Sequence, residues 1–209
     1  MNLTNITDGT NKLQELGKKF GTDKRTNNDS DGYLNIMYQY MKDISNDNLN
    51  ILEIGVREGP SILMWEAFFP NAKIYGLDID DCTKHNNDRI KIIQGDQSDT
   101  KALESISSNV DYFDIIIDDG SHRNDDILIS YNYLIKKLRP GGMYIIEDLS
   151  NSYPEGTCGN NKVKGCKRED LQALFNSIIY EMDKSSWGSQ TDYLTIHFYP
   201  SLCIIKKRK

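Results

Sequence analysis

Short apolar runs rich in isoleucine and valine alternate with segments of helical spacing through the middle of the chain. Runs this uniformly apolar are typical of strands covered on both faces, as in a parallel sheet. The predicted strands are 49–56, 73–79, 90–96, 113–119 and 142–149. Between them, 61–69 and 127–138 have the spacing of crossover helices, and Pro and Gly at 139–142 stop the second helix. Repeated β-α-β units predict a doubly wound, Rossmann-like α/β fold.

The chain before the first strand has two helical patterns, 11–20 and 33–41, separated by Gly-Thr-Asp-Lys at 21–24. We interpret residues 1–48 as an N-terminal helical cap on an α/β core that covers 49–209. Cap and core together form one predicted domain, 1–209, a length that suits a single core.

The last third of the chain changes character after the fifth predicted strand. The polar, Gly- and Asn-rich stretch 151–166 predicts a long loop, which we interpret as a substrate lid. An amphipathic helix is predicted at 169–182, with its apolar stripe on the core. Two strands around Pro200-Ser201, 193–199 and 202–207, predict an antiparallel hairpin that completes a seven-stranded, mostly parallel sheet.

Composition narrows the class of protein. The formal net charge of -6 argues against broad attraction to nucleic acid, and no apolar run approaches the length of a membrane span. The N-terminus lacks the apolar centre of a signal peptide, and the four cysteines form no Cys-x-x-Cys pair. We therefore expect reduced thiols and a cytoplasmic protein. A disulfide or metal site at Cys158 and Cys166 is the less favoured alternative to an ordinary loop.

Candidate ligand-binding residues follow the strands, because ligands of open α/β sheets bind at the carboxyl ends of the strands. The first strand carries Glu53 and is followed by Gly55, which permits close backbone approach. The second strand ends at Asp78, at a spacing from Gly55 that suits an acid accepting hydrogen bonds from ribose hydroxyls. Asp96 and Gln97 end the third strand and are candidates for the adenine edge. Together these residues predict an adenosine-containing ligand, the alternative being solvated strand-end acids.

The residues around Gly55 bear on which adenosine cofactor binds. A dinucleotide pyrophosphate needs a second glycine for clearance, and Arg57 stands where that glycine is expected. The Glu53 carboxylate disfavours a phosphate but suits a sulfonium or an ammonium group. S-adenosylmethionine carries both cations and no phosphate, so it is the predicted cofactor.

Five segments of the chain together resemble class I S-adenosylmethionine-dependent methyltransferases. They are ILEIGVREG (51–59), IYGLDID (74–80), FDIIIDDGSH (113–122), LRPGGMYIIEDL (138–149) and IHFYPSLCIIKK (196–207). More narrowly, DDGSH and IIEDL resemble the macrolide-sugar O-methyltransferases of the mycinose-pathway type, and GTDK is similar to a segment upstream of the domain in related sequences. The resemblance covers about residues 14–207, whereas those enzymes carry an additional N-terminal domain.

The resemblance also implies the chemistry of the fourth and fifth strand ends. In a class I sheet these strands are neighbours, so their carboxylates converge and need a cation between them. Oxygen ligands favour Mg²⁺, and the resemblance places the ligands at Asp119, Glu147 and Asp148. Asp118 is then left for the cofactor side or the strand end. The resemblance makes His122 the general base, against the plainer alternative of a loop histidine that caps a helix.

The expected function is metal-dependent O-methylation of a sugar hydroxyl on a nucleotide sugar, a glycan or a glycosylated natural product. Three alternatives remain open: a catechol-type O-methyltransferase acting on an aromatic diol, an NAD-linked oxidoreductase, and a cofactor-binding scaffold without catalysis. The expected partner is a small-molecule or sugar acceptor, with neither nucleic acid nor membrane, and a homo-oligomer remains open.

Overall fold

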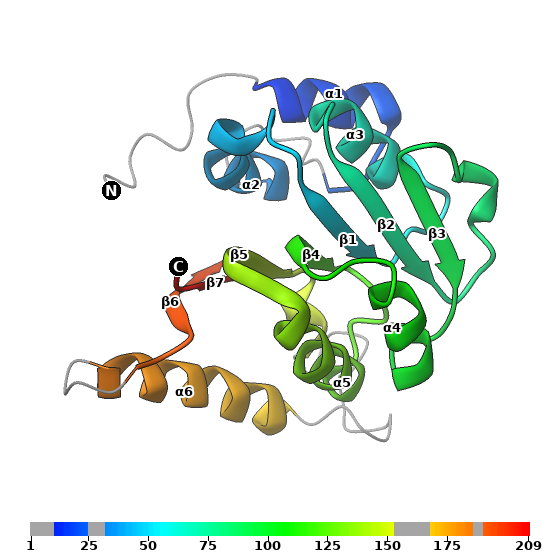
Figure 1. Cartoon of the computed structure of the whole chain (residues 1–209). Helices are drawn as coiled ribbons and strands as arrows, with labels where there is room; N and C mark the ends of the chain where they lie inside the picture. Colours follow the sequence, from blue (N-terminus) through cyan, green and yellow to red (C-terminus); the bar gives the residue numbers. More distant parts are fainter. Residues whose placement is uncertain (1–10, 25–31, 153–167, 186–189) are drawn as a thin grey trace.

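The computed structural model describes residues 11–24, 32–152, 168–185 and 190–209 (Figure 1). The described residues form a seven-stranded sheet in the order β3-β2-β1-β4-β5-β7-β6. Its strands are β1 (Asn50–Ile54), β2 (Lys73–Asp78), β3 (Ile90–Gln94), β4 (Phe113–Asp118), β5 (Leu138–Ile146), β6 (Tyr193–Tyr199) and β7 (Leu202–Lys207). The first five strands are parallel, and β7 pairs antiparallel with both β5 and β6. The predicted Rossmann-like fold with a C-terminal hairpin is confirmed.

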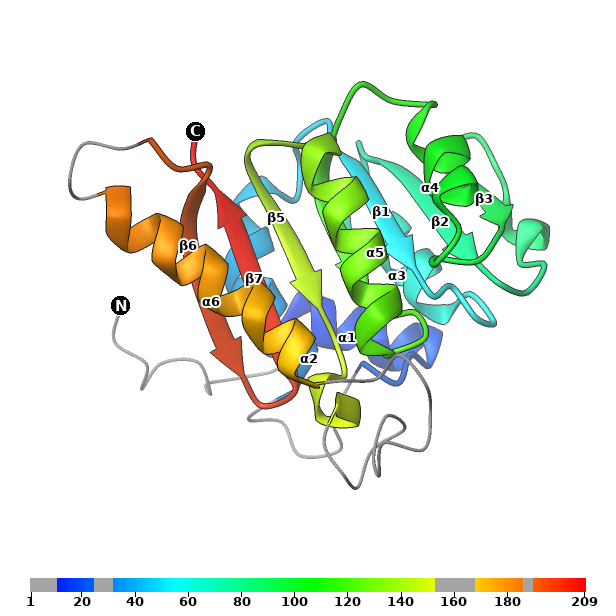
Figure 2. The same ribbon diagram turned by 90° about the horizontal axis from the view of Figure 1, so that it is seen from below.

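Helices cover both faces of this sheet (Figure 1). The helices α1, α2 and α3 lie on one face, and α4, α5 and α6 lie on the other, where Figure 2 shows them in front of the strands. Their bounds are α1 (Lys12–Phe20), α2 (Tyr33–Met41), α3 (Pro60–Phe68), α4 (Thr100–Ser107), α5 (Asn124–Leu134) and α6 (Arg168–Lys184). Short 3₁₀ turns are η2 (Lys42–Ile44), η3 (Thr83–His85), η4 (Ile135–Lys137) and η5 (Leu149–Ser152).

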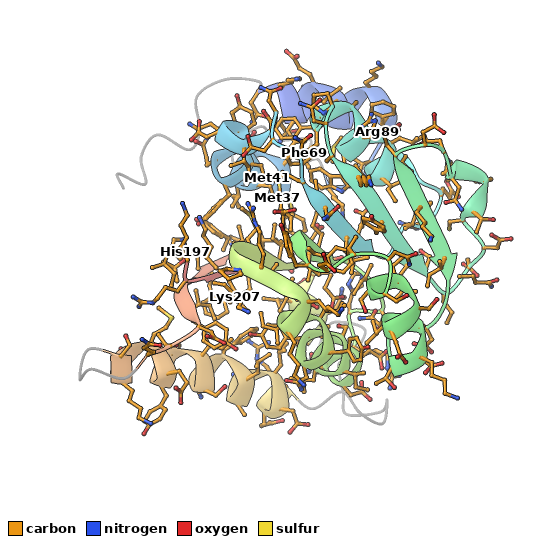
Figure 3. All side chains as sticks on the ribbon, viewed as in Figure 1. Met37, Met41, Phe69, Arg89, His197 and Lys207 are labelled. Atoms are coloured by element: carbon orange, nitrogen blue, oxygen red, sulfur yellow. The ribbon has the colours of Figure 1, made fainter. Side chains whose placement is uncertain are left out.

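The alternation of side chains along each strand produces two hydrophobic cores, one on each face. Ile51, Ile115 and Ile117 join the core under α1, α2 and α3, whereas Leu52 and Ile116 join the core under α4, α5 and α6. Met37, Met41 and Phe69, labelled in Figure 3, belong to the first of these cores. Burial on both faces explains why the strands are uniformly apolar in sequence.

The structure corrects the sequence-based elements in two places. The helix α4 was not predicted, because Thr100–Ser107 is polar apart from Ala102, Leu103 and Ile106. The strand β5 begins at Leu138 and not at residue 142, so the predicted turn lies inside the strand. The register between β4 and β5 shifts there, from Phe113–Leu138 to Ile115–Met143, and Gly141 has a φ of 79°.

The C-terminal predictions agree with the structure where it describes them. The predicted stripe of α6 packs on the second core: Leu171 and Ile178 are buried, and Leu174, Phe175 and Met182 are partly buried. Cys82 and Cys203 are free, buried thiols. Cys158, Cys166 and nearly all of the predicted lid 151–166 lie outside the described residues. Among the described helices, none combines the length and apolarity that a membrane crossing requires.

The neighbouring strands β1, β4 and β5 reach the same edge of the sheet at their carboxyl ends. The Asp119 backbone amide donates a hydrogen bond to the Ile54 carbonyl oxygen, and the Glu147 backbone amide donates one to the Asp118 carbonyl oxygen, both at 3.0 Å. The sheet order reverses between β1 and β4, which are neighbours although β2 and β3 lie between them in the sequence. Ligands of open α/β sheets bind at such a switch point, so a ligand-binding site is expected at the edge after β1 and β4.

Candidate active site

A cavity of about 780 Å³ lies at this edge of the sheet, within the usual range for small-molecule sites. Most of the sequence-predicted site residues line it: Gly55, Asp78, Asp96, Gln97, Asp119, His122, Glu147 and Asp148. Glu53 and Asp118 are not among its lining residues, and both are buried. The cavity therefore brings together the strand-end residues that the sequence marked separately, apart from those two.

Gly55 lets the chain after β1 pass directly against the chain after β4. Its φ is 86°, a left-handed conformation that favours glycine. A Cβ atom at this position would lie 2.0 Å from the carbonyl oxygen of Asp119. Both the backbone conformation and the close contact thus require glycine. Gly55 allows the segment after β1 to pack directly on the Asp119 backbone at the cavity.

Asp78 organises the loops on the other side of the cavity. Its Oδ2 accepts a hydrogen bond from the Arg57 amide at 2.6 Å, and its Oδ1 accepts one from the Asp80 amide at 2.8 Å. Each carboxylate oxygen has two lone pairs, so both can accept a further bond from a ligand hydroxyl. The Arg57 guanidinium, where a dinucleotide site would have glycine, forms an exposed ion pair with Asp23 at 2.9 Å.

Asp118 points away from the cavity, because successive side chains of a strand point to opposite faces. Its Oδ1 accepts from Gln97 at 3.1 Å, and its Oδ2 accepts from Ser130 at 2.5 Å and Tyr144 at 3.1 Å. Burial raises the pKa of Asp118, and the hydrogen bonds oppose that shift. Gln97, also buried, accepts from the Ser121 amide at 2.6 Å. Asp118 and Gln97 thus fix the wall that carries the loop after β4.

Glu53 and Glu147 belong to a buried charge cluster centred on Lys24. Glu53 accepts from Ser61 at 2.9 Å and from the Trp65 indole at 3.0 Å, both on α3. The Lys24 ammonium lies 2.9 Å from Glu147 and 3.4 Å from Glu53, and it also donates to Asp119. The Lys24 side chain is only 1% exposed, so the cation that compensates these three carboxylates in this structure is supplied by the protein itself.

The pKa values in this cluster follow from burial and from the excess of carboxylates. Burial alone would lower the pKa of Lys24, but Glu147, Asp119 and Glu53 together raise it well above its usual value. Burial raises the pKa of Glu147, and the Lys24 ammonium opposes that rise. Lys24 is therefore a permanent cation at neutral pH.

Asp119, His122 and Asp148 form a second, more accessible group at the cavity. One ligand atom from each residue lies within 4.8 Å of the others, as in a metal-binding group. The His122 Nε2 lies 3.4 Å from Asp148 Oδ2 and 4.0 Å from Asp119 Oδ1. His122 and Asp148 both have left-handed backbones, with φ of 58° and 56°. Such strain costs about 1–3 kcal/mol per residue and is concentrated at functional sites.

Tyr33 of α2 reaches the same group from the N-terminal region. Its hydroxyl donates to Asp148 Oδ1 at 2.8 Å and lies 3.3 Å from the Ser201 carbonyl oxygen. Burial raises the pKa of Tyr33, so its hydroxyl is protonated at neutral pH and can act as a donor. Tyr33 lines the cavity together with Gly21, Thr22, Asp23 and Lys24.

Sequence analysis did not identify Lys24 and Tyr33 as site residues, because both lie outside the α/β pattern. The Gly-Thr-Asp-Lys segment stood out only as the separator of two helices and as a segment similar to one in related sequences, with no role for its lysine, yet that lysine is the buried cation. The signal that could have found Lys24 is the excess of acids at the predicted strand ends, which demands a cation. No comparable signal distinguishes Tyr33, since it begins an ordinary helical pattern rich in tyrosine.

Known proteins share this fold. Residues 52–149 match the family model of a methyltransferase domain. Residues 52–149 thus belong to this methyltransferase domain family, and they lie within the Rossmann-like fold described above. Within it, the chain resembles the macrolide-sugar O-methyltransferases, as the sequence motifs had indicated.

Two curated relatives illustrate that resemblance. The mycinamicin VI 2''-O-methyltransferase of Micromonospora griseorubida is 34% identical over 184 residues, which is 81% of this chain and 46% of the relative. The demethylmacrocin O-methyltransferase of Streptomyces fradiae is 32% identical and covers 81% of this chain and 47% of the relative. The chain therefore spans about half the length of the curated relatives that it matches.

Solved structures of methyltransferases are also similar to this chain. The MycE methyltransferase of the mycinamycin biosynthetic pathway, in complex with Mg, SAH and mycinamycin VI, superposes with a TM-score of 0.80 at 32% identity. That match covers 96% of this chain and 55% of MycE. An O-methyltransferase from Bacillus cereus in complex with SAH shares the fold, with a TM-score of 0.58 at 15% identity.

Proposed function

We propose that this protein is an S-adenosylmethionine-dependent, Mg²⁺-dependent O-methyltransferase that acts on a sugar hydroxyl. The observation that carries the proposal is the group of Asp119, His122 and Asp148 at the edge of a cavity lined by the predicted cofactor residues. The names of both curated relatives describe O-methyltransferases, and MycE was solved with Mg and SAH. A sugar of a glycosylated natural product is accordingly the favoured acceptor over a free nucleotide sugar or a glycan terminus.

Cofactor binding is assigned to the half of the cavity between β1, β2 and β3. Gly55 allows the ligand to approach the backbone, and Asp78 accepts hydrogen bonds from the ribose hydroxyls. Asp96 and Gln97 stand next to the adenine position. Glu53 and Asp118 act indirectly, because Glu53 anchors α3 and Lys24, and Asp118 anchors the loop after β4.

The residues present also fit a hard divalent cation. Asp119 and Asp148 offer carboxylate oxygens at the cavity, with side chains 19% and 40% exposed. Glu147 is the third proposed ligand, and since its Oε1 is engaged by Lys24, it offers Oε2. Carboxylate oxygens suit Mg²⁺, and an ion close to Asp119 and Asp148 would offset their mutual repulsion.

The chemistry is divided between the bound groups and the chain. Bound S-adenosylmethionine supplies an electrophilic methyl group, and Mg²⁺ lowers the pKa of a sugar hydroxyl. His122, partly exposed at the cavity, accepts the proton of that hydroxyl at an imidazole nitrogen. Asp119 and Asp148 orient the acceptor, and the wall built on Asp118 holds the loop that carries His122. Orientation of acceptor and methyl group supplies much of the rate acceleration.

The test is methyl transfer from radiolabelled S-adenosylmethionine to a panel of acceptors, with and without EDTA. The panel contains glycosylated macrolides, nucleotide sugars and a catechol. We expect transfer to a sugar acceptor that EDTA abolishes and Mg²⁺ restores. Calorimetry should in addition detect S-adenosylhomocysteine binding and no NAD binding. Full activity in EDTA would refute the metal requirement, and transfer to the catechol alone would refute the sugar assignment.

A further inference from the structure

We infer that Lys24 and Tyr33 are positioning residues, which aim the carboxylates of Asp119 and Asp148 at His122. Each residue holds one oxygen of a carboxylate and thereby turns the other oxygen toward the imidazole. The N-terminal helical region is then part of the active site and not only a cap on the sheet. This inference rests on the proposed function, because it concerns the group to which the divalent cation is assigned.

The two oxygens of the Asp119 carboxylate face different groups, Lys24 and His122. Its Oδ2 accepts from the Lys24 ammonium, while its Oδ1 lies 4.0 Å from His122 Nε2. Lys24 is buried and is also held by Glu147 and Glu53, so its position is fixed from three sides. The direction of Oδ1 is therefore set by a cation that water cannot reach.

The Asp148 carboxylate shows the same division. Its Oδ1 accepts from the Tyr33 hydroxyl at 2.8 Å, while its Oδ2 lies 3.4 Å from His122 Nε2. The Asp148 side chain is 40% exposed, so without Tyr33 it would be free to rotate toward solvent. Two carboxylates that follow different strands, β4 and β5, thus turn one oxygen each toward the same imidazole, and both held oxygens are bound by N-terminal residues.

A merely structural role is the competing explanation, in which the two contacts attach the N-terminal helices to the sheet. The two roles make different predictions. An attachment contributes to folding stability, whereas a positioning residue changes the affinity for the cation in a protein that is still folded. Groups that orient metal ligands by hydrogen bonds typically change metal affinity by about 10–100-fold when they are removed.

Tyr33→Phe is the decisive variant because it removes one hydroxyl and keeps the ring. Tyr40→Phe is the matched control, since Tyr40 lies on the same helix, is also half-buried, and does not line the cavity. Its hydroxyl pairs with Tyr199 at 2.7 Å and with His197, which Figure 3 labels on β6. Each variant thus loses one hydroxyl of α2 that has a hydrogen-bond partner.

The measurement is Mn²⁺ affinity of the protein saturated with S-adenosylhomocysteine, followed by electron paramagnetic resonance. We expect Tyr33→Phe to weaken Mn²⁺ binding about 10–100-fold. We expect Tyr40→Phe to leave it unchanged, with S-adenosylhomocysteine affinity the same in both. Equal Mn²⁺ affinities in the two variants would overturn the role of Tyr33. A wild-type protein that binds no Mn²⁺ would instead overturn the proposed function, and this inference with it.

For Lys24, the direction of the change in Mn²⁺ affinity distinguishes charge compensation from positioning of Asp119. If the ammonium only compensates charge, Lys24→Met removes a competing cation and Mn²⁺ binds more tightly. If it aims Asp119, the same change weakens Mn²⁺ binding. Lys24→Met leaves the buried carboxylates of Glu53 and Glu147, and the partly exposed one of Asp119, without their cation. It is therefore also made together with Glu53→Gln, which lowers the buried negative charge without changing a proposed ligand. Weaker binding in a folded variant supports the inference, and tighter binding overturns it.

Discussion

Replacing Gly55 with alanine tests the close contact between the chain after β1 and the chain after β4. The added Cβ would lie 2.0 Å from the Asp119 carbonyl oxygen, whereas real Cβ contacts are essentially never under 3.0 Å. The two chains would therefore have to move apart by about 1 Å. Asp119 would move with its backbone, because the atom that is displaced belongs to its main chain.

Two costs add in this variant. A non-glycine residue at a φ of 86° costs about 1–2 kcal/mol in left-handed conformation. Forcing extra volume into a packed contact costs about 1–3 kcal/mol more. We therefore expect Gly55→Ala to lower the free energy of unfolding by about 2–5 kcal/mol, the sum of those two ranges. The displacement of Asp119 should also weaken divalent-cation binding.

Gly141→Ala is the matched control for the conformational cost. Gly141 has a φ of 79°, and its added Cβ would meet only the Lys209 side chain, at 3.1 Å or more. That flexible side chain at the end of the chain can move away, so we expect a loss of about 1–2 kcal/mol. Urea unfolding measures the free energy of unfolding of both variants. Titration with Mn²⁺ measures the expected loss of divalent-cation binding in Gly55→Ala. Equal unfolding free energies for the two variants would refute the argument from the Asp119 contact.

Three further variants test other parts of the site. Asp78→Ala should weaken S-adenosylhomocysteine binding by about 1–3 kcal/mol in calorimetry, whereas the neighbouring, exposed Asp81→Ala should not; unchanged affinity would remove Asp78 from the site. Asp118→Ala should lower the free energy of unfolding by at least about 2 kcal/mol, because three buried donors lose their acceptor, and a neutral result in urea unfolding would contradict its role as an anchor. His122→Ala should reduce turnover about 10²–10⁴-fold while keeping cofactor and metal affinity, with residual activity that rises with pH as hydroxide replaces the base. Normal turnover of that variant would return His122 to the role of a loop residue.

The sequence by itself determined the sheet and the side of the sheet where the site lies. Short runs with an apolar centre, such as 115–117 within 113–119, are typical of strands buried on both faces, and such strands favour parallel pairing with crossover helices. The carboxyl ends of those strands then meet at one edge, which predicts that Asp78 lies at the ligand-binding edge. The family resemblance added Asp119 and Asp148 at the same edge. These predictions depend on local periodicity, which is written into neighbouring residues.

The family resemblance distinguished Asp119 from Asp118, but only the tertiary structure decided what Asp118 contacts. In Asp118-Asp119 the first carboxylate turns to Ser130 and Tyr144, and the second faces the cavity. Two adjacent acids are equivalent in a sequence, because the face that each one takes depends on where β4 ends and on what packs above it. The pairing of β4 with its neighbouring strands determines both where β4 ends and which residues pack on each of its faces.

The cation of the buried cluster was likewise decided by tertiary structure. The acids at the strand ends indicated that a positive charge was needed, and the chain supplies one of its own from Lys24, 95 residues before Asp119. Nothing in the local pattern of residues 21–24 predicts this, because the segment becomes informative only when α1 and α2 pack on the sheet. Contacts between residues far apart in sequence are fixed by packing, so the sequence predicted the need for a cation and the fold determined which residue meets it.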